Sequence, residues 1–194
     1  TLSSFSAPVP HVNTSKIDWK SVVQTEEGSS YVDIFVTDLS ERAGDILVYG
    51  KVRSGDSFVS ACMHVTGNQR QWFVLPRPDS SMLQVHQEIS GMLKRILPRT
   101  VGASWKAKPV KRSYAFDDRS VPREETEYLK VVYSSKYAAP ETLRGQHFST
   151  ILGAKASLTE NFILKRKLMG PCWVRIENQM PNRAPVSWCA WEAT

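Results

Sequence analysis

The stretch QWFVLPRPDSSMLQVHQEISGMLKRILP, residues 71–98, contains a strand pattern, a pair of prolines and an amphipathic helix pattern in succession. Residues 71–75 form a short apolar and aromatic run that is typical of a buried strand. The spacing of Ser81 and Gln84 predicts a capping box, in which the two residues satisfy each other's polar groups at the start of a helix. Between residues 82–97 the apolar side chains recur every three or four positions and predict a helix with one apolar stripe: Met82, Val85, Ile89, Leu93 and Ile96.

The residues before this stretch predict a β-rich part that spans residues 31–75. Three further strand patterns, separated by short polar or Gly-containing turns, lie at residues 31–36, 46–53 and 58–65. With the strand at 71–75 they predict a meander or a small barrel. Residues 1–30 are rich in Ser, Thr, Pro and Gly and show no apolar period, which predicts a flexible N-terminal segment.

The residues after this stretch extend the strand–helix pair into the order β-α-β-β-α-β over residues 71–194. The remaining elements are predicted as strands at 108–116 and 128–133, a helix at 157–168 and a strand at 173–176. Ser157 and Glu160 have capping-box spacing at the start of that helix. This order is the split βαβ plan of ferredoxin-like and RNA-recognition domains. The predicted fold class is therefore α+β, with the β-rich part joined to a split βαβ sheet that carries two helices.

The composition is that of an ordinary globular protein. The 194 residues are 41% hydrophobic and 23% charged, which excludes a disordered, collagen-like or coiled-coil chain. No apolar run reaches the roughly 18 residues of a membrane span. The three cysteines are widely spaced and form no CxxC motif, so we expect buried, reduced thiols rather than disulfides or a zinc site. Three tryptophans that lie in strand patterns are expected in the core: Trp72, Trp173 and Trp188.

The 25 basic residues outnumber the 19 acidic residues and are unevenly distributed. Between Lys94 and Arg112 there are seven basic residues and no acidic one, and Trp105 and Tyr114 lie in or beside this run. Cations beside aromatic rings are what the binding of single-stranded nucleic acid requires. The same charges also fit a solvated face or, at the end of the second helix, the negative pole of the helix dipole. The candidate nucleic-acid contacts are Lys106, Lys108, Lys111, Arg112, Lys165, Arg166 and Lys167.

The sequence shows no self-contained active site. The motifs GxGxxG, GxxxxGK[ST] and GxSxG do not occur. The adjacent aspartates Asp117 and Asp118 lie in a charged loop and are interpreted as a solvated turn. The basic-Gly-aromatic signature of RNA-recognition domains is missing from residues 128–133, so the predicted strand order does not by itself imply RNA binding. We expect no catalytic and no metal-binding residue in the chain.

Two strings of the C-terminal third are specific because Trp and Cys are rare residues: FILKRKLMGPCW at 162–173 and PVSWC at 185–189. Five more strings agree with them in order and spacing: YGKV at 49–52, FVLPR at 73–77, KPVKRSYAF at 108–116, VPREETEYL at 121–129 and GQHF at 145–148. Together they resemble the N-terminal region of the catalytic subunit of eukaryotic DNA polymerase alpha, a family-B polymerase. The resemblance covers about residues 31–193.

This resemblance implies that residues 31–194 are a polymerase N-terminal domain, a non-catalytic scaffold that contacts the template strand. The parent enzyme would be a nuclear, magnesium-dependent DNA-directed DNA polymerase that extends an RNA–DNA primer on a DNA template. Primase and an accessory subunit would be its partners, with no membrane involved. The family's catalytic carboxylates and its zinc and iron–sulfur ligands lie outside this chain, so no cofactor is transferred to it. The residues alone leave two alternatives open, a free-standing single-stranded nucleic-acid-binding module and a purely structural part.

Overall fold

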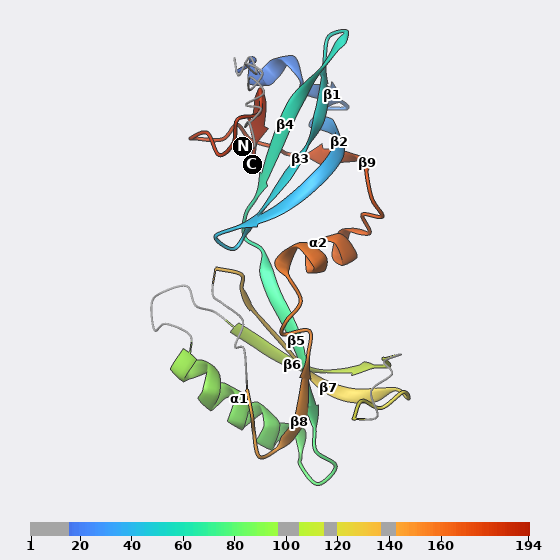
Figure 1. The fold of residues 1–194 in the computed structure, drawn as a ribbon, viewed down its shortest axis with the longest axis vertical. Helices are drawn as coiled ribbons and strands as arrows, with labels where there is room; N and C mark the ends of the chain where they lie inside the picture. Colours follow the sequence, from blue (N-terminus) through green and yellow to red (C-terminus); the bar gives the residue numbers. More distant parts are fainter. Residues whose placement is uncertain (1–15, 97–104, 115–119, 137–142) are drawn as a thin grey trace, which may run out of the picture. The chain divides into compact units, whose positions relative to one another are not determined.

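The computed structural model describes residues 16–96, 105–114, 120–136 and 143–194 (Figure 1). The chain divides into two compact units, each assembled from separate stretches. Among the described residues, the first unit takes 16–38, 48–64 and 171–194, and the second takes 39–47 and those between 65 and 170. Two sheets and two α-helices make up the described part, which confirms the predicted α+β class.

The first unit is built on a strand-rich sheet that contains the first three strands of the predicted β-rich part. The fourth, predicted at 71–75, lies instead in the sheet of the second unit, so the prediction of one meander or barrel over residues 31–75 is wrong. Its strands follow the order β1-β2-β3-β4-β10, and β9 pairs with β2. Apolar side chains at alternate positions of β2, namely Val32, Ile34 and Val36, are buried in its core. The strands are β1 (Gln24–Glu26), β2 (Ser29–Arg42), β3 (Asp45–Ser54), β4 (Ser57–Val65), β9 (Cys172–Glu177) and β10 (Trp191–Ala193), and a short 3-10 helix, η1 (Trp19–Ser21), precedes them.

The second unit is a four-stranded antiparallel sheet with α1 packed along one face (Figure 1). Its elements are β5 (Gln69–Pro76), α1 (Met82–Ile96), β6 (Trp105–Arg112), β7 (Thr126–Ser134), β8 (Phe148–Leu152) and α2 (Leu158–Arg166). The predicted helix stripe lies in the core, where Val85, Ile89 and Leu93 pack with residues of the sheet such as Trp72 and Val131. Both predicted capping boxes form: the Gln84 amide donates to Ser81 Oγ, and the Glu160 amide donates to Ser157 Oγ.

The strands of this sheet lie in the order β6-β7-β5-β8, which is the spatial order of a split βαβ sheet. The fourth strand is β8, a short and partly polar edge strand for which the sequence shows no clear alternation. The strand predicted at 173–176 forms as β9, but it pairs with β2 of the first unit, from Tyr31 opposite Glu177 to Val36 opposite Cys172. The predicted place of the last strand is therefore wrong, and α2 follows the fourth strand instead of preceding it.

The tryptophans and cysteines only partly follow the prediction. Trp72 is fully buried, but Trp173 is 55% exposed and Trp188 is 85% exposed. Trp173 lies opposite Phe35 on the outer side of β2, away from the buried valines, so the prediction of a core position is wrong for it and for Trp188. All three cysteines are free, but only Cys62 is buried as expected, whereas Cys172 and Cys189 are half-buried. Burial raises the pKa of the Cys62 thiol to about 11.

Residues 1–15 of the predicted flexible segment lie outside the described residues. In the rest of that segment, η1 and β1 form, and the Ile17 amide donates to the Ala190 carbonyl at 3.0 Å. At the C-terminal end of the described residues, β10 takes only Trp191–Ala193.

The carboxylate of Glu192 in β10 is a hydrogen-bond acceptor at the centre of the first unit's C-terminal segment. Its side chain is 6% exposed and accepts from Lys16 Nζ at 2.9 Å. It also accepts from the Val186 amide at 3.1 Å and from the Ser187 amide and hydroxyl at 2.8 and 2.6 Å. Burial acts to raise the pKa of Glu192, but the hydrogen bonds from Ser187 and Lys16 outweigh burial and lower the pKa below its ordinary value.

Because the pKa of Glu192 is lower in the folded than in the unfolded chain, its ionised form stabilises the first unit at neutral pH. This stabilisation is complete above the ordinary glutamate pKa and disappears as the pH falls through the lowered pKa. We expect Glu192→Gln to reduce the free energy of unfolding by roughly 1–3 kcal/mol at pH 7. Urea unfolding at stepwise lower pH should show the gap between the two proteins closing, and a gap that stays constant would contradict this role.

Candidate nucleic-acid interface

The sheet face opposite α1 in the second unit carries basic side chains from two strands. Leu129 and Val131 of β7 lie in the core beneath α1, so Lys130 between them points to the other face. Its cross-strand partners, Lys108 in β6 and Phe73 in β5, lie on that face too. Two more basic residues of β6 alternate on the same side, Lys106 and Arg112.

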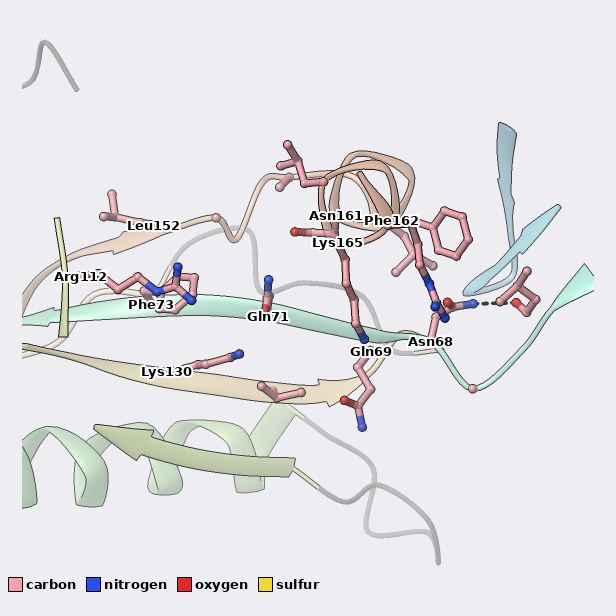
Figure 2. Close-up of a pocket in the computed structure, with 18 of the residues that line it drawn as sticks. Asn68, Gln69, Gln71, Phe73, Arg112, Lys130, Leu152, Asn161, Phe162 and Lys165 are labelled. Atoms are coloured by element: carbon pink, nitrogen blue, oxygen red, sulfur yellow. Dashed lines mark hydrogen bonds between the residues drawn. The ribbon is translucent and has the colours of Figure 1, made fainter. Parts of the chain in front are cut away.

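α2 borders this open face and completes a groove of about 700 Å³ within the second unit (Figure 2). The start of α2 is held by Glu41, which lies in the end of β2 that belongs to the second unit. The Glu41 carboxylate accepts from the Leu158 amide at 3.0 Å and forms an ion pair with Arg70. The last turn of α2 then supplies Lys165 and Arg166 to the groove. In Figure 2 the side chain of Lys165 extends from the helix toward β5, on the side where Gln69 and Gln71 lie.

Phe73 is the aromatic centre of the groove. The Arg112 guanidinium lies 5.2 Å and the Lys130 ammonium 6.0 Å from the centroid of its ring. The Tyr114 ring, directly after β6, meets Phe73 edge-on with centroids 6.1 Å apart. Two cations and two rings thus share one patch of the open face, which is the combination that binding of single strands requires.

The cations of the groove repel one another. Burial lowers the pKa of Lys130, and the neighbouring charges of Arg112, Lys108 and Lys165 lower it further. Within the described ranges, no carboxylate forms an ion pair with any of these four residues. An anion that enters the groove would relieve this repulsion, so the arrangement favours a ligand that carries several negative charges.

The seven candidate contacts separate into two groups in the structure. Arg112, Lys165 and Arg166 line the groove, and Lys106 and Lys108 lie on the same open face of the sheet. Lys111 is the cross-strand neighbour of Glu127 and lies on the opposite face of β6 from Arg112. Lys167 is the C-cap of α2 in a left-handed conformation. Neither Lys111 nor Lys167 is among the residues that line the groove.

The groove also contains residues that the sequence interpretation missed. Lys130 and Phe73 are at its centre, and Gln71 and Asn161 add side-chain amides. The available signal was strand alternation: once Trp72 and Val74 are placed in the core, Phe73 between them must face the other way. The same reasoning applies to Lys130.

The described residues hold no group of three or more His, Cys, Asp or Glu side chains that could bind a metal ion. Asp117 and Asp118, interpreted as a solvated turn, lie outside the described residues. Among the helices that the structure describes, none has the length and apolar character needed to cross a membrane.

Comparison with known proteins identifies the relatives of this sequence. No protein-family model matches the chain. The DNA polymerase alpha catalytic subunit of Arabidopsis thaliana is 34% identical over 194 aligned positions, which cover 82% of this chain and 13% of the relative. The corresponding subunit of Xenopus laevis is 33% identical over 80% of this chain and 12% of the relative. The chain belongs to the DNA polymerase alpha catalytic subunit family. The catalytic subunit of Saccharomyces cerevisiae agrees, with 31% identity over 86% of this chain.

The match covers only a small part of each relative. In these three comparisons the aligned segment is 11–13% of the length of the polymerase subunit. The chain therefore spans only a small part of the length of the relatives it matches, and the groove of the second unit lies within this part.

Proposed function

We propose that this chain is the non-catalytic N-terminal part of a replicative DNA polymerase, and that the groove of its second unit holds the phosphates of a single-stranded template. The observation that carries the proposal is the convergence of Arg112, Lys130 and Lys165 from three different elements beside Phe73. A surface that only faced solvent would gain nothing from placing like charges so close together. None of the described residues that line the groove is acidic, and the phosphates of a nucleic-acid strand would supply negative charge there.

Family membership supports the rest of the proposal. The whole protein would be a DNA-directed DNA polymerase of the nucleus, with a DNA template and an RNA–DNA primer as substrates. Primase and an accessory subunit would be its protein partners. The magnesium-binding carboxylates of the reaction, and the zinc and iron–sulfur ligands, would belong to other parts of that protein. The proposal assigns no catalytic step to this chain, whose part is to bind and position the template.

The test is fluorescence anisotropy of a labelled oligothymidylate titrated with this chain at several salt concentrations. Each phosphate that the groove neutralises contributes about −0.7 to the slope of log affinity against log salt. Three to four cations in the groove predict a slope of roughly −2 to −3. The control is a variant that loses two positive charges on the first unit, outside the groove: Lys20→Gln combined with Lys51→Gln. It should keep the wild-type salt slope. Absence of binding even at about 50 mM salt would favour the purely structural role, because phosphate contacts are strongest there.

A further inference from the structure

Phe73 lines the groove on the open face of the sheet, where its ring could take up a planar group. Its neighbours in β5, Trp72 and Val74, are buried beneath α1, and its own side chain is only half-buried on the open face. Its cross-strand neighbours are Lys130 in β7 and Leu152 in β8, so it has a basic side chain on one side and an apolar one on the other.

The basic side chains that approach the Phe73 ring can move away and leave room for a ligand. The Tyr114 ring meets the Phe73 ring at an angle of 64° and packs in turn against Tyr128, with ring centroids 5.3 Å apart. The Arg112 and Lys130 side chains that approach the ring come from exposed and half-buried positions and are long enough to swing away. A cation over an accessible ring contributes less than a stacked nucleobase does. Binding is therefore most favourable when a base stacks on the Phe73 ring and the two cations contact phosphates instead of the ring.

We propose that Phe73 is a stacking platform for one unpaired nucleobase, with Arg112 and Lys130 moving from the ring to the phosphates beside that base. This inference rests on the proposed function, and it specifies the substrate class of the groove. The ligand must be a strand that has bases and can expose them. In a duplex each base is stacked between its neighbours and cannot lie on the ring without being extruded. The side-chain amides of Gln71 and Asn161 lie in the same groove and offer hydrogen bonds to a base edge.

The experiment compares an oligothymidylate with an abasic oligonucleotide of the same length and charge, bound to the intact chain and to Phe73→Leu. We expect Phe73→Leu to weaken oligothymidylate binding roughly tenfold or more while leaving its salt slope unchanged. Binding of the abasic strand should be weak and equal for both proteins. Phe73→Trp should restore or exceed the wild-type affinity, because the larger ring preserves stacking. Phe58→Leu is the matched control, since Phe58 is an exposed aromatic residue of the first unit.

The outcomes separate this inference from the proposed function. If the abasic strand binds as tightly as oligothymidylate, or if Phe73→Leu behaves like Phe58→Leu, the stacking platform is refuted while the phosphate groove stands. If neither strand binds the wild-type chain at low salt, the proposed function fails and the platform fails with it. Circular dichroism of each variant checks that loss of binding does not come from loss of folding.

Discussion

Replacing Arg112 and Lys130 together by glutamine is expected to weaken oligothymidylate binding about 100-fold at low salt. Both cations lie in the groove, and no described carboxylate competes with phosphate for either of them. A hydrogen bond to a charged group contributes about 1.5–3 kcal/mol, so losing two such contacts costs at least about 3 kcal/mol. At about 1.4 kcal/mol per tenfold change this corresponds to two orders of magnitude. Anisotropy titration of the double variant measures the loss directly.

The salt dependence gives this prediction a second readout. Removing two phosphate contacts should make the salt slope shallower by about 1.4, whereas the Phe73→Leu variant should not change it. The double variant should also lose affinity for the abasic strand, since the charges do not depend on the bases. A double variant that binds like the Lys20→Gln, Lys51→Gln control would show that the template, if bound, lies elsewhere.

Replacing Ile89 by alanine is expected to lower the stability of the second unit by about 2–5 kcal/mol. Ile89 is fully buried on the stripe of α1, among residues such as Trp72, Leu129 and Phe148. Removing its side-chain carbons leaves a cavity that the two-layer core can close only in part. A shift of the urea midpoint followed by circular dichroism measures the effect.

The matched control for this substitution is in the same helix. Leu83 is 66% exposed, so Leu83→Ala should change the free energy of unfolding by less than about 0.5 kcal/mol. Equal effects of the two variants would mean that α1 does not pack on the sheet through the face that carries Ile89. With rising urea, the proposed binding activity should disappear together with the fold, at a lower urea concentration for Ile89→Ala than for Leu83→Ala.

Local patterns were enough to predict most elements of this fold. The stripe of α1, the two capping boxes and the alternation of β2 each depend on neighbouring residues, and all are present. Strand pairing depends on residues far apart, and there the prediction went wrong. Nothing within residues 172–177 says that their partner is β2, more than 130 positions earlier in the chain. The short edge strand β8 has too few alternating residues to be recognised alone.

The basic character of the candidate site could be predicted from the sequence, but the residues at its centre could not. Arg112 and Lys165 could be found because runs of basic residues are visible in the sequence. Lys130 stands alone between apolar residues, and it becomes part of the groove only through its register with Lys108 and Phe73. Lys111 belongs to the same basic run as Arg112, yet strand alternation places it on the other face.

The division of the chain into discontinuous units has a consequence for its synthesis. The second unit is complete once residue 170 has left the ribosome, since the later of its two stretches ends there. The first unit begins earlier in the chain but must wait for β9 and β10 before β2 and β4 have their partners. Until then the edges of β2 and β4 that receive these strands are open. The groove of the second unit is therefore complete while the sheet of the first unit still lacks two strands. The unit that starts first in the chain is the last to be completed.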